Sequence, residues 1–170
     1  MKEDGRRGEP LRDVVVEPEF DALIPGEYIE SDIERLAIYR RLYGLTTFAQ
    51  LDELSEELHD RFGKFPWQVE NLFGVVRLRL QAAKAGFKKV AVSESAMEIE
   101  FPPDSNTAFY EGEQFQKIMQ TVSAMRGKGA MLRQHGSTLK LAISLEKYSS
   151  SKKPLEIGLE VLHLLSDDIS

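Results

Sequence analysis

The spacing of apolar residues changes near Gly86, and this change constrains the fold more than any other feature of the sequence. Before Gly86, apolar residues recur every three to four positions, the spacing that gathers side chains on one face of a helix. After it, the stretch from Met97 to Phe101 alternates apolar and acidic residues, as a strand with one buried face does. The chain is therefore expected to form helices first and β-hairpins later.

Three helices are expected before the change in spacing. The first covers 32–43, with Asp32 as its N-cap. The second runs from a cap at Thr46 or Thr47 to Phe62, and Gly63 suits the left-handed residue that follows a helix. The third begins at Pro66 and ends before Gly86. The residues that recur at helical spacing on the first helix are Ile33, Leu36, Ala37, Arg40 and Tyr43. The apolar residues of the second are Leu51, Leu54, Leu58 and Phe62.

The other segments predict a sheet. A strand is expected at 13–17, hairpins at 87–101 and 130–143, and helices at 111–126 and from Pro154 to about 165. The predicted class is α+β, in which a helical N-terminal part is followed by two β-hairpins and two helices. We expect these hairpins to form a mostly antiparallel sheet covered by helices.

Composition narrows the class of protein. The chain has 170 residues, a net charge of −6 and no cysteine, which excludes disulfides and thiolate chemistry and suits a cytoplasmic location. No apolar run approaches the roughly 20 residues of a membrane span, so no membrane contact is expected. The polar N-terminus lacks the features of a signal peptide. Residues 1–12 are interpreted as a disordered lead-in or linker, and 13–170 as a single domain.

The sequence contains none of the common catalytic or cofactor-binding motifs. Gly127-Lys128-Gly129 lacks the earlier glycine and the following hydroxyl residue that a phosphate-binding loop requires. The three histidines lie far apart without ligand spacing, so no catalytic residue, metal site or cofactor is predicted. A hydrolase that uses clustered carboxylates is an alternative supported only by the acidic composition.

The second helix is expected to carry an acidic stripe opposite its apolar one. At about 100° per residue, Glu53, Glu57 and Asp60 lie nearly opposite the leucines, with Glu56 beside them. Asp60 falls in the last turn, where the helix dipole makes a carboxylate unfavourable by about 0.3–1 kcal/mol. Two interpretations remain open: a solvated face with an ordinary Glu57–Arg61 pair, or a docking surface for a partner's arginines.

A signature motif lies in the same stretch. The run Glu57-Leu58-His59-Asp60-Arg61-Phe62-Gly63, followed by Pro66, resembles the E-L-x-D-R-F-G-x-x-P signature of the C-terminal domain of the bacterial transcription-repair coupling factor (TRCF) family. The parts similar to other stretches of that family are Ala22-x-Ile24-Pro25 with Tyr28-Ile29, Arg35-Leu36-x-x-Tyr39-Arg40-Arg41, and Arg77-x-Arg79 with Gly86. The resemblance covers about residues 13–165.

This resemblance implies a regulatory role in DNA repair. The full-length family protein is a DNA translocase that uses ATP to displace stalled RNA polymerase and recruits the excision-repair protein UvrA. This domain follows the motor, so the chain itself is not expected to be an enzyme or to reach DNA except through the full-length protein. In the family it docks intramolecularly on the UvrA-binding module and masks it, an autoinhibitory contact. The resemblance assigns Glu57 and Asp60 to arginines of that module, with Arg61 beside them. Glu53 is added to this predicted interface because the helical wheel places it on the same face.

A second surface offers an alternative function. The segment 126–153, called the basic segment below, contains seven basic residues and one acid, although the whole chain is acidic. Such a segment could contact nucleic acid or RNA polymerase through phosphates or carboxylates. It could equally be the solvated surface of a hairpin, and no part of the family signature falls within it.

Overall fold

The computed structural model describes residues 14–148 and 152–166, so the expected lead-in at 1–12 lies outside the described residues. In chain order the elements are β1 Val15–Pro18, α1 Asp32–Gly44, α2 Phe48–Phe62, α3 Trp67–Ala85, β2 Lys89–Val92, β3 Ala96–Glu100, α4 Thr107–Glu111, α5 Glu113–Ala124, the 3-10 turn η1 Arg126–Lys128, β4 Ala130–His135, β5 Thr138–Ser144, α6 Leu145–Tyr148 and α7 Pro154–Ser166. The predicted α+β class is confirmed. Within the described ranges, no helix is both long and apolar enough to cross a bilayer.

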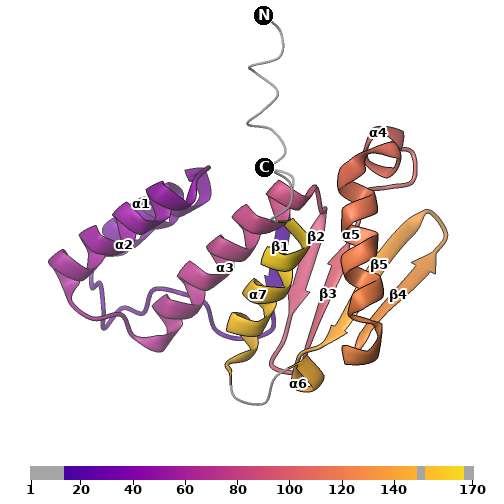
Figure 1. The fold of residues 1–170 in the computed structure, drawn as a ribbon. Helices are drawn as coiled ribbons and strands as arrows, with labels where there is room; N and C mark the ends of the chain where they lie inside the picture. Colours follow the sequence, from indigo (N-terminus) through magenta and orange to yellow (C-terminus); the bar gives the residue numbers. More distant parts are fainter. Residues whose placement is uncertain (1–13, 149–151, 167–170) are drawn as a thin grey trace, which may run out of the picture.

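The five strands form one sheet in the order β1-β2-β3-β5-β4. β1 pairs in parallel with β2, and the other neighbours are antiparallel, with Val90 opposite Ile99 and Ile99 opposite Leu141. The predicted mostly antiparallel sheet is therefore confirmed. Helices α3, α7 and α5 lie over one face of this sheet (Figure 1).

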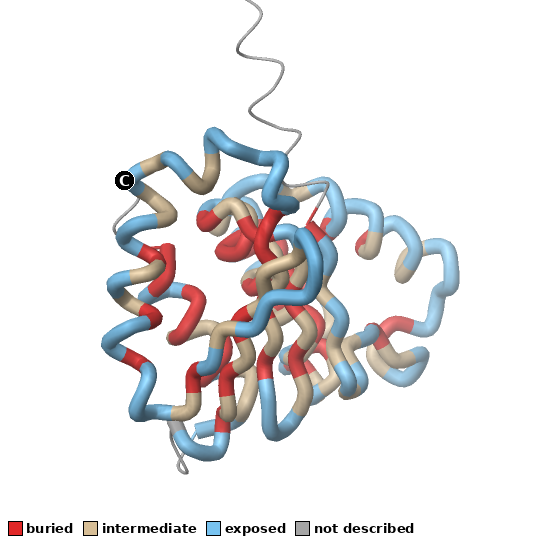
Figure 2. Tube along the Cα trace, turned by 90° about the vertical axis from the view of Figure 1, so that its right-hand side faces the viewer, coloured by how far each residue is buried: buried red, intermediate tan, exposed pale blue. Residues whose placement is uncertain are grey.

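Two hydrophobic clusters divide the molecule into lobes. In the sheet lobe, the inward residues of the strands pack against α5, α7 and the second half of α3, and Figure 2 shows buried residues between the helices and the strands. In the helical lobe, α1 and α2 pack against the other side of α3. α3 belongs to both, because Val76 and Leu80 enter the helical cluster while Leu78 and Ala82 enter the sheet cluster.

The helix ends follow local capping chemistry. Ser31, not the predicted Asp32, is the N-cap of α1, because its hydroxyl accepts the backbone N–H of Glu34. Asp32 lies inside the first turn instead, where the helix dipole favours a carboxylate. Thr47 caps α2 and forms a reciprocal capping box with Gln50. α3 ends at Gly86, whose left-handed backbone (φ 80°) a residue without Cβ adopts at little cost.

The predicted face of α1 is wrong. The buried residues are Ile38 and Leu42, whereas Ile33, Leu36 and Tyr43 point away from the core. Apolar residues occur on both sides of this helix, so helical spacing alone cannot identify the side that packs. Contacts with α2 and α3 decide the matter, and they leave the predicted stripe exposed.

Candidate functional site

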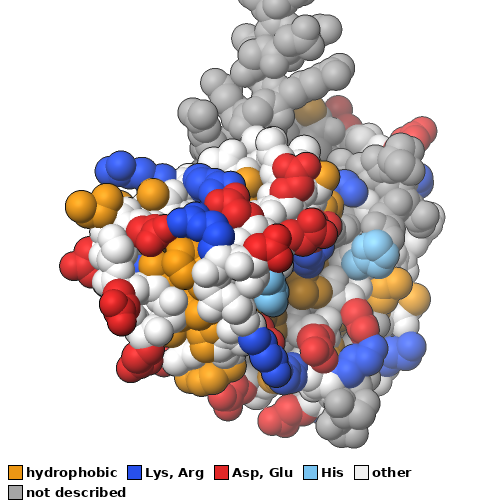
Figure 3. All heavy atoms as spheres, turned by 90° about the vertical axis from the view of Figure 1, so that its left-hand side faces the viewer, with side chains coloured by type: hydrophobic (Ala, Val, Ile, Leu, Met, Phe, Trp, Pro, Cys, Tyr) orange, Lys and Arg blue, Asp and Glu red, His pale blue; other side chains and the backbone are white. Residues whose placement is uncertain are grey.

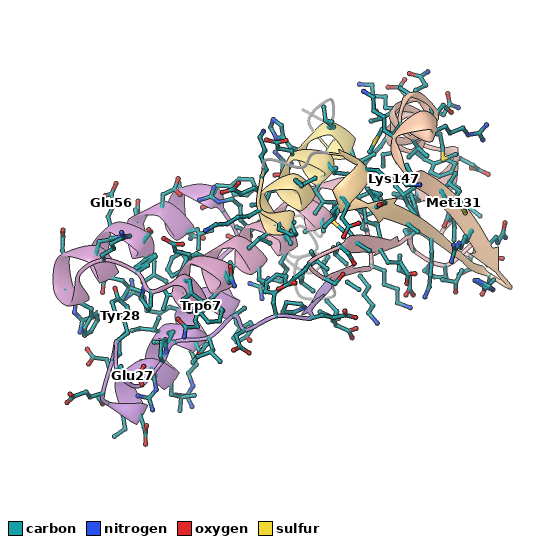
Figure 4. All side chains as sticks on the ribbon, turned by 90° about the horizontal axis from the view of Figure 1, so that it is seen from below. Glu27, Tyr28, Glu56, Trp67, Met131 and Lys147 are labelled. Atoms are coloured by element: carbon teal, nitrogen blue, oxygen red, sulfur yellow. The ribbon has the colours of Figure 1, made fainter. Side chains whose placement is uncertain are left out.

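The acidic side of α2 is positioned by the burial of its opposite side. Leu51, Leu54 and Leu58 are buried in the helical cluster. Because helical geometry places Glu53 and Asp60 opposite these leucines, both carboxylates are turned to solvent. Figure 4 shows Glu56, from the same outward side, pointing away from the rest of the molecule. The predicted acidic stripe is thus an exposed face of α2.

Glu57 is held by two arginines of the same domain. Its Oε1 and Oε2 accept hydrogen bonds from Nη1 and Nη2 of Arg41 on α1, at 2.8 and 2.7 Å. Nη1 of Arg61 donates a longer bond of 3.3 Å to Oε1, which is the predicted i,i+4 pair. Arg61 also contacts Glu34 on α1. The chain Glu34–Arg61–Glu57–Arg41 forms an ion-pair ladder that ties α1 to α2.

The ladder sets the charge of Glu57. Hydrogen bonds from Arg41, and more weakly from Arg61, lower the pKa of the Glu57 carboxyl to about 2, although burial opposes this shift. The same contact raises the pKa of Arg41. A carboxylate with both oxygens engaged by one guanidinium has little remaining capacity for a second bidentate partner. Glu57 therefore organises the face more than it offers free charge.

Asp60 and Glu53 differ from Glu57 in their partners. Both are exposed, and neither forms a hydrogen bond or an ion pair with any residue that the structure describes. Asp60 lies in the last turn of α2, where its charge is unfavourably placed against the helix dipole. The side chain of the neighbouring His59, by contrast, has a partner, because the His59 ring stacks on the Phe65 ring at a centroid distance of 3.9 Å. Asp60 and Glu53, together with Glu56 beside them, are the carboxylates of α2 that are available to a partner.

Sequence reasoning missed the outward side of α1. Ile33, Leu36 and Tyr43 are 84%, 50% and 67% exposed, and the exposed Arg40 on this side has no ion pair within the described residues. Figure 3, which views the molecule from the side of α1 and α2, shows hydrophobic side chains between acidic and basic ones. The signal was present in the sequence, because α1 is apolar on two sides. We call this surface the outer face, and it comprises Ile33, Leu36, Arg40, Tyr43, Glu53, Glu56 and Asp60.

The basic segment does not form one continuous patch. Nζ of Lys140 lies 3.1 Å from Glu98 on the neighbouring strand, and Nζ of Lys153 lies 3.9 Å from Glu70. Lys152 pairs with Glu160. The remaining basic residues are spread over η1, β4 and α6, where Figure 4 shows Lys147 on α6. Part of the local positive charge is therefore neutralised inside the domain.

Two observations concern the carboxylates and histidines that a hydrolase or a metal site would use. Within the described ranges, no group of three or more histidine or carboxylate side chains is arranged to hold a metal ion. A pocket of about 250 Å³ lies between the first turns of α3 and α7, lined by Phe20, Trp67, Asn71, Glu94, Lys153, Pro154 and Leu155. This pocket contains a single carboxylate, so it lacks the facing pair that the hydrolase alternative needs.

The sequence of the chain is similar to one family model and to several known proteins. A family model described as the TRCF domain matches residues 19–111 of the chain. A transcription-repair-coupling factor of Staphylococcus epidermidis is 31% identical over 114 residues, or 67% of this chain. The proteins of the same name from Bacillus subtilis and Escherichia coli are 26% identical over 152 residues and 37% identical over 86 residues, or 89% and 51% of this chain. The chain spans only 10%, 12% and 8% of the lengths of these three relatives.

A solved structure has the same fold. It is described as the C-terminal domain of transcription-repair coupling factor, and it superposes with a TM-score of 0.70 at 20% sequence identity. The match covers 92% of this chain and 95% of that one. The mixed sheet and its helices are therefore an architecture already observed in such a domain.

Proposed function

Because the chain belongs to the transcription-repair coupling factor (TRCF) domain family, we propose that it is a regulatory interaction domain without ATPase activity of its own. In this proposal it docks on the UvrA-binding module of the longer cytoplasmic protein that contains it, and masks that module until repair begins. UvrA, RNA polymerase and DNA are then reached only through the full-length protein. The docking residues are carboxylates on the outer face of α2.

One observation carries this proposal. Asp60 and Glu53 are exposed and unpaired among the described residues, and they flank a carboxylate that arginines already hold in place. Arginine donates two parallel hydrogen bonds to a free carboxylate, and such charge-assisted bonds are shorter and stronger than neutral ones. A partner's arginine would find both oxygens of Asp60 available. The small helix-dipole penalty at Asp60 is tolerable if an interface contact offsets it.

The ladder has a supporting role in this proposal. Arg61 belongs to the signature motif, and it spans Glu57 on its own helix and Glu34 on α1. It thereby holds α1 and α2 at a constant spacing and keeps the carboxylates in place for docking. Glu57 and Arg61 then act mainly as positioning residues, while Asp60 and Glu53 make the intermolecular contacts.

Calorimetry tests this assignment. The affinity of the chain for the separately expressed UvrA-binding module is compared for wild type, Asp60→Lys and Glu53→Lys. Because a like charge replaces an attractive contact, we expect Asp60→Lys to weaken binding at least about tenfold. Glu146→Lys is the matched control, since it makes the same charge change on α6, away from the outer face. Glu57→Lys is measured separately, because it also breaks the contact with Arg41.

Each result of the calorimetric test has a different consequence for the docking proposal. Asp60→Lys binding as tightly as wild type would mean that these carboxylates do not make the contact. If wild type does not bind as a separate chain, a single chain with a flexible linker raises the effective concentration and repeats the test. An absence of contact in the linked chain would overturn the docking proposal.

The basic segment supports a second, weaker candidate function, contact with nucleic acid or RNA polymerase. Arg126, Lys128, Arg133 and Lys147 are exposed and have no ion pair with a described residue. Binding through phosphates would fall steeply as salt rises, because counterions are released. A mobility-shift titration against duplex DNA at low salt measures this. A shift of the DNA at micromolar concentrations of the chain, which an Arg133→Glu/Lys147→Glu variant no longer produces, would favour this candidate.

A further inference from the structure

We infer that the outward side of α1 is the apolar half of the same docking face, and that the partner carries an apolar ridge beside its cations. The inference rests on the proposed function, since it adds a second chemistry to the same site. Its residues are Ile33, Leu36 and Tyr43 of α1. None of them belongs to the acidic motif that suggested the docking role.

The exposure of these side chains is unusual for a helix on the surface of a soluble domain. Such a helix normally presents one apolar side to the core and polar residues to water, and a helix apolar all round is usually covered on both sides. α1 buries Ile38 and Leu42, yet it leaves three large apolar residues outward. Because these three recur at helical spacing, they form a continuous stripe instead of isolated contacts with water.

The other exposed apolar residues of the described chain are scattered, in contrast to the three on α1. Val15, Leu23, Trp67, Met131 and Leu164 are also exposed, but they are spread over β1, a loop, α3, β4 and α7. Single exposed apolar side chains are common on soluble proteins and need no special explanation. A group of three on one side of a single helix is therefore the exception in this molecule.

The ion-pair ladder places the apolar stripe and the acids on one surface. Glu34 and Arg41 lie on the side of α1 that faces α2, and Glu57 and Arg61 lie on the facing side of α2. At about 100° per residue, Ile33 and Arg40 lie on the outward side of α1 nearest the ladder, and Leu36 and then Tyr43 lie farther from α2. Asp60 and Glu53 lie on the outward side of α2, beyond the ladder. This surface is the one that Figure 3 presents.

Charge selects the kind of partner. The outer face has three carboxylates, on Glu53, Glu56 and Asp60, and one guanidinium, on Arg40, without ion pairs among the described residues. An anionic membrane or a nucleic acid would be repelled by this surplus of negative charge. A second copy of the chain would bring like charges together, which is unfavourable. A protein surface with at least two arginine or lysine side chains beside an apolar ridge fits both halves.

The two halves have different energetic roles. Charges at the rim of an interface mainly set specificity and the rate of association, whereas buried aliphatic and aromatic anchors supply most of the affinity. We therefore assign partner choice to Asp60 and Glu53, and binding strength to Ile33, Leu36 and Tyr43. The tightness of the masking contact depends on α1 under this assignment.

The test uses an Ile33→Gln/Leu36→Gln variant of the chain in the same calorimetric assay. Glutamine is a good helix former, and both side chains are exposed, so circular dichroism and thermal unfolding should be unchanged. Tyr43 is left intact because Arg79 lies over its ring at 5.5 Å. We expect binding at least about tenfold weaker, the loss typical of removing an interface anchor. Leu164→Gln, an equally polar change on α7, is the control and should bind as wild type does.

Salt distinguishes the two halves of the face. Ions screen exposed charges, so the effect of Asp60→Lys should shrink at high salt, while that of Ile33→Gln/Leu36→Gln should persist. If Ile33→Gln/Leu36→Gln binds like wild type while Asp60→Lys does not, the inference about α1 is overturned and the docking proposal is retained. If wild type fails to bind even in the linked chain, both the inference and the docking proposal are overturned. Self-association of the wild-type chain that the apolar variant abolishes would make the occupant a second copy, against the basic partner inferred here.

Discussion

The open face of the sheet and the outer face of α1 and α2 are both rich in charge, but they handle it differently. On the sheet, oppositely charged residues on neighbouring strands meet, as Lys89 does Glu17 at 2.9 Å and Lys140 does Glu98 at 3.1 Å. On α1 and α2, the ladder pairs charged residues between the helices, and the charged residues Arg40, Glu53, Glu56 and Asp60 on the outward sides form no ion pair with a described residue. The sheet face therefore pairs part of its charge within the domain, although Arg133 opposite Lys140 has no ion pair among the described residues. The outer face pairs none of the charges on Arg40, Glu53, Glu56 and Asp60 with a described residue.

This difference indicates that a domain can bury two hydrophobic clusters and still leave one surface unpaired. The hydrophobic cluster of the helical lobe is built from the inward residues of α1, α2 and α3, and the outward residues Ile33, Leu36 and Tyr43 take no part in it. Substitutions in the two clusters, at the end of α1, in the ladder and at Asp60 test how far the two surfaces differ.

The largest effect is expected from a cavity in either cluster. Leu58 in the helical lobe and Ile99 in the sheet lobe are fully buried, so Leu58→Ala and Ile99→Ala should each lower the free energy of unfolding by about 2–5 kcal/mol. Because α3 joins the clusters, urea transitions followed by Trp67 fluorescence and by circular dichroism should coincide for both variants. Separate transitions for Leu58→Ala would mean that the lobes unfold independently.

A smaller effect is expected at the end of α1. Nη2 of Arg79 on α3 donates to the carbonyl oxygens of Leu42 and Tyr43 at 3.0 and 3.3 Å, and burial lowers the pKa of this guanidinium. Arg79→Met should cost about 1–2 kcal/mol, because it removes hydrogen bonds from a charged donor to the last carbonyls of the helix. Arg77→Met is the control, since Arg77 forms an exposed pair with Asp52 and lies over the ring of Phe48 at 5.7 Å. Each of these contacts is worth about 1 kcal/mol or less at an exposed site, so this variant should cost less than Arg79→Met does. Equal losses in urea unfolding would argue against this anchoring of α1.

The ion-pair ladder should make the free energy of unfolding depend on pH in the acidic range. The pKa of Glu57 is lowered to about 2, so its contribution is fully present above the ordinary carboxyl pKa of about 4.5 and is lost as the pH falls toward 2. The pair is more than a third exposed, which limits this contribution to at most about 1 kcal/mol. Arg41→Met should therefore flatten the fall of stability in that window. Arg40→Met removes a neighbouring arginine that has no ion pair with a described residue, so it should leave the slope unchanged.

The smallest effect separates stability from docking at one residue. Asp60 opposes the dipole at the end of α2, so Asp60→Asn should raise the free energy of unfolding by about 0.3–0.5 kcal/mol while weakening binding to the UvrA-binding module. Precise urea midpoints at low salt detect such a change. Glu53→Gln, in the middle of the same helix, should lack the stability gain. A loss of stability in Asp60→Asn would show that the carboxylate supports the fold.

Most elements could be predicted because their determinants are local. Leucine spacing and the threonine cap specify α2, and alternation specifies the strand from Ala96 to Glu100. The short elements α4, η1 and α6 escaped prediction, since one helical turn carries too few residues to show a period. The signature motif also identified the family, which the comparisons confirm.

By itself, then, the sequence determined the α+β class, most helices and strands, the acidic side of α2 and the family. The tertiary structure alone decided which side of α1 is buried, that β1 lies parallel to β2, and that Arg41 holds Glu57 from 16 residues away. It also decided that Lys140 and Lys153 of the basic segment meet distant acids. The physical reason is common to all four: periodicity and caps act between near neighbours, whereas packing and ion pairs depend on residues that only folding brings together.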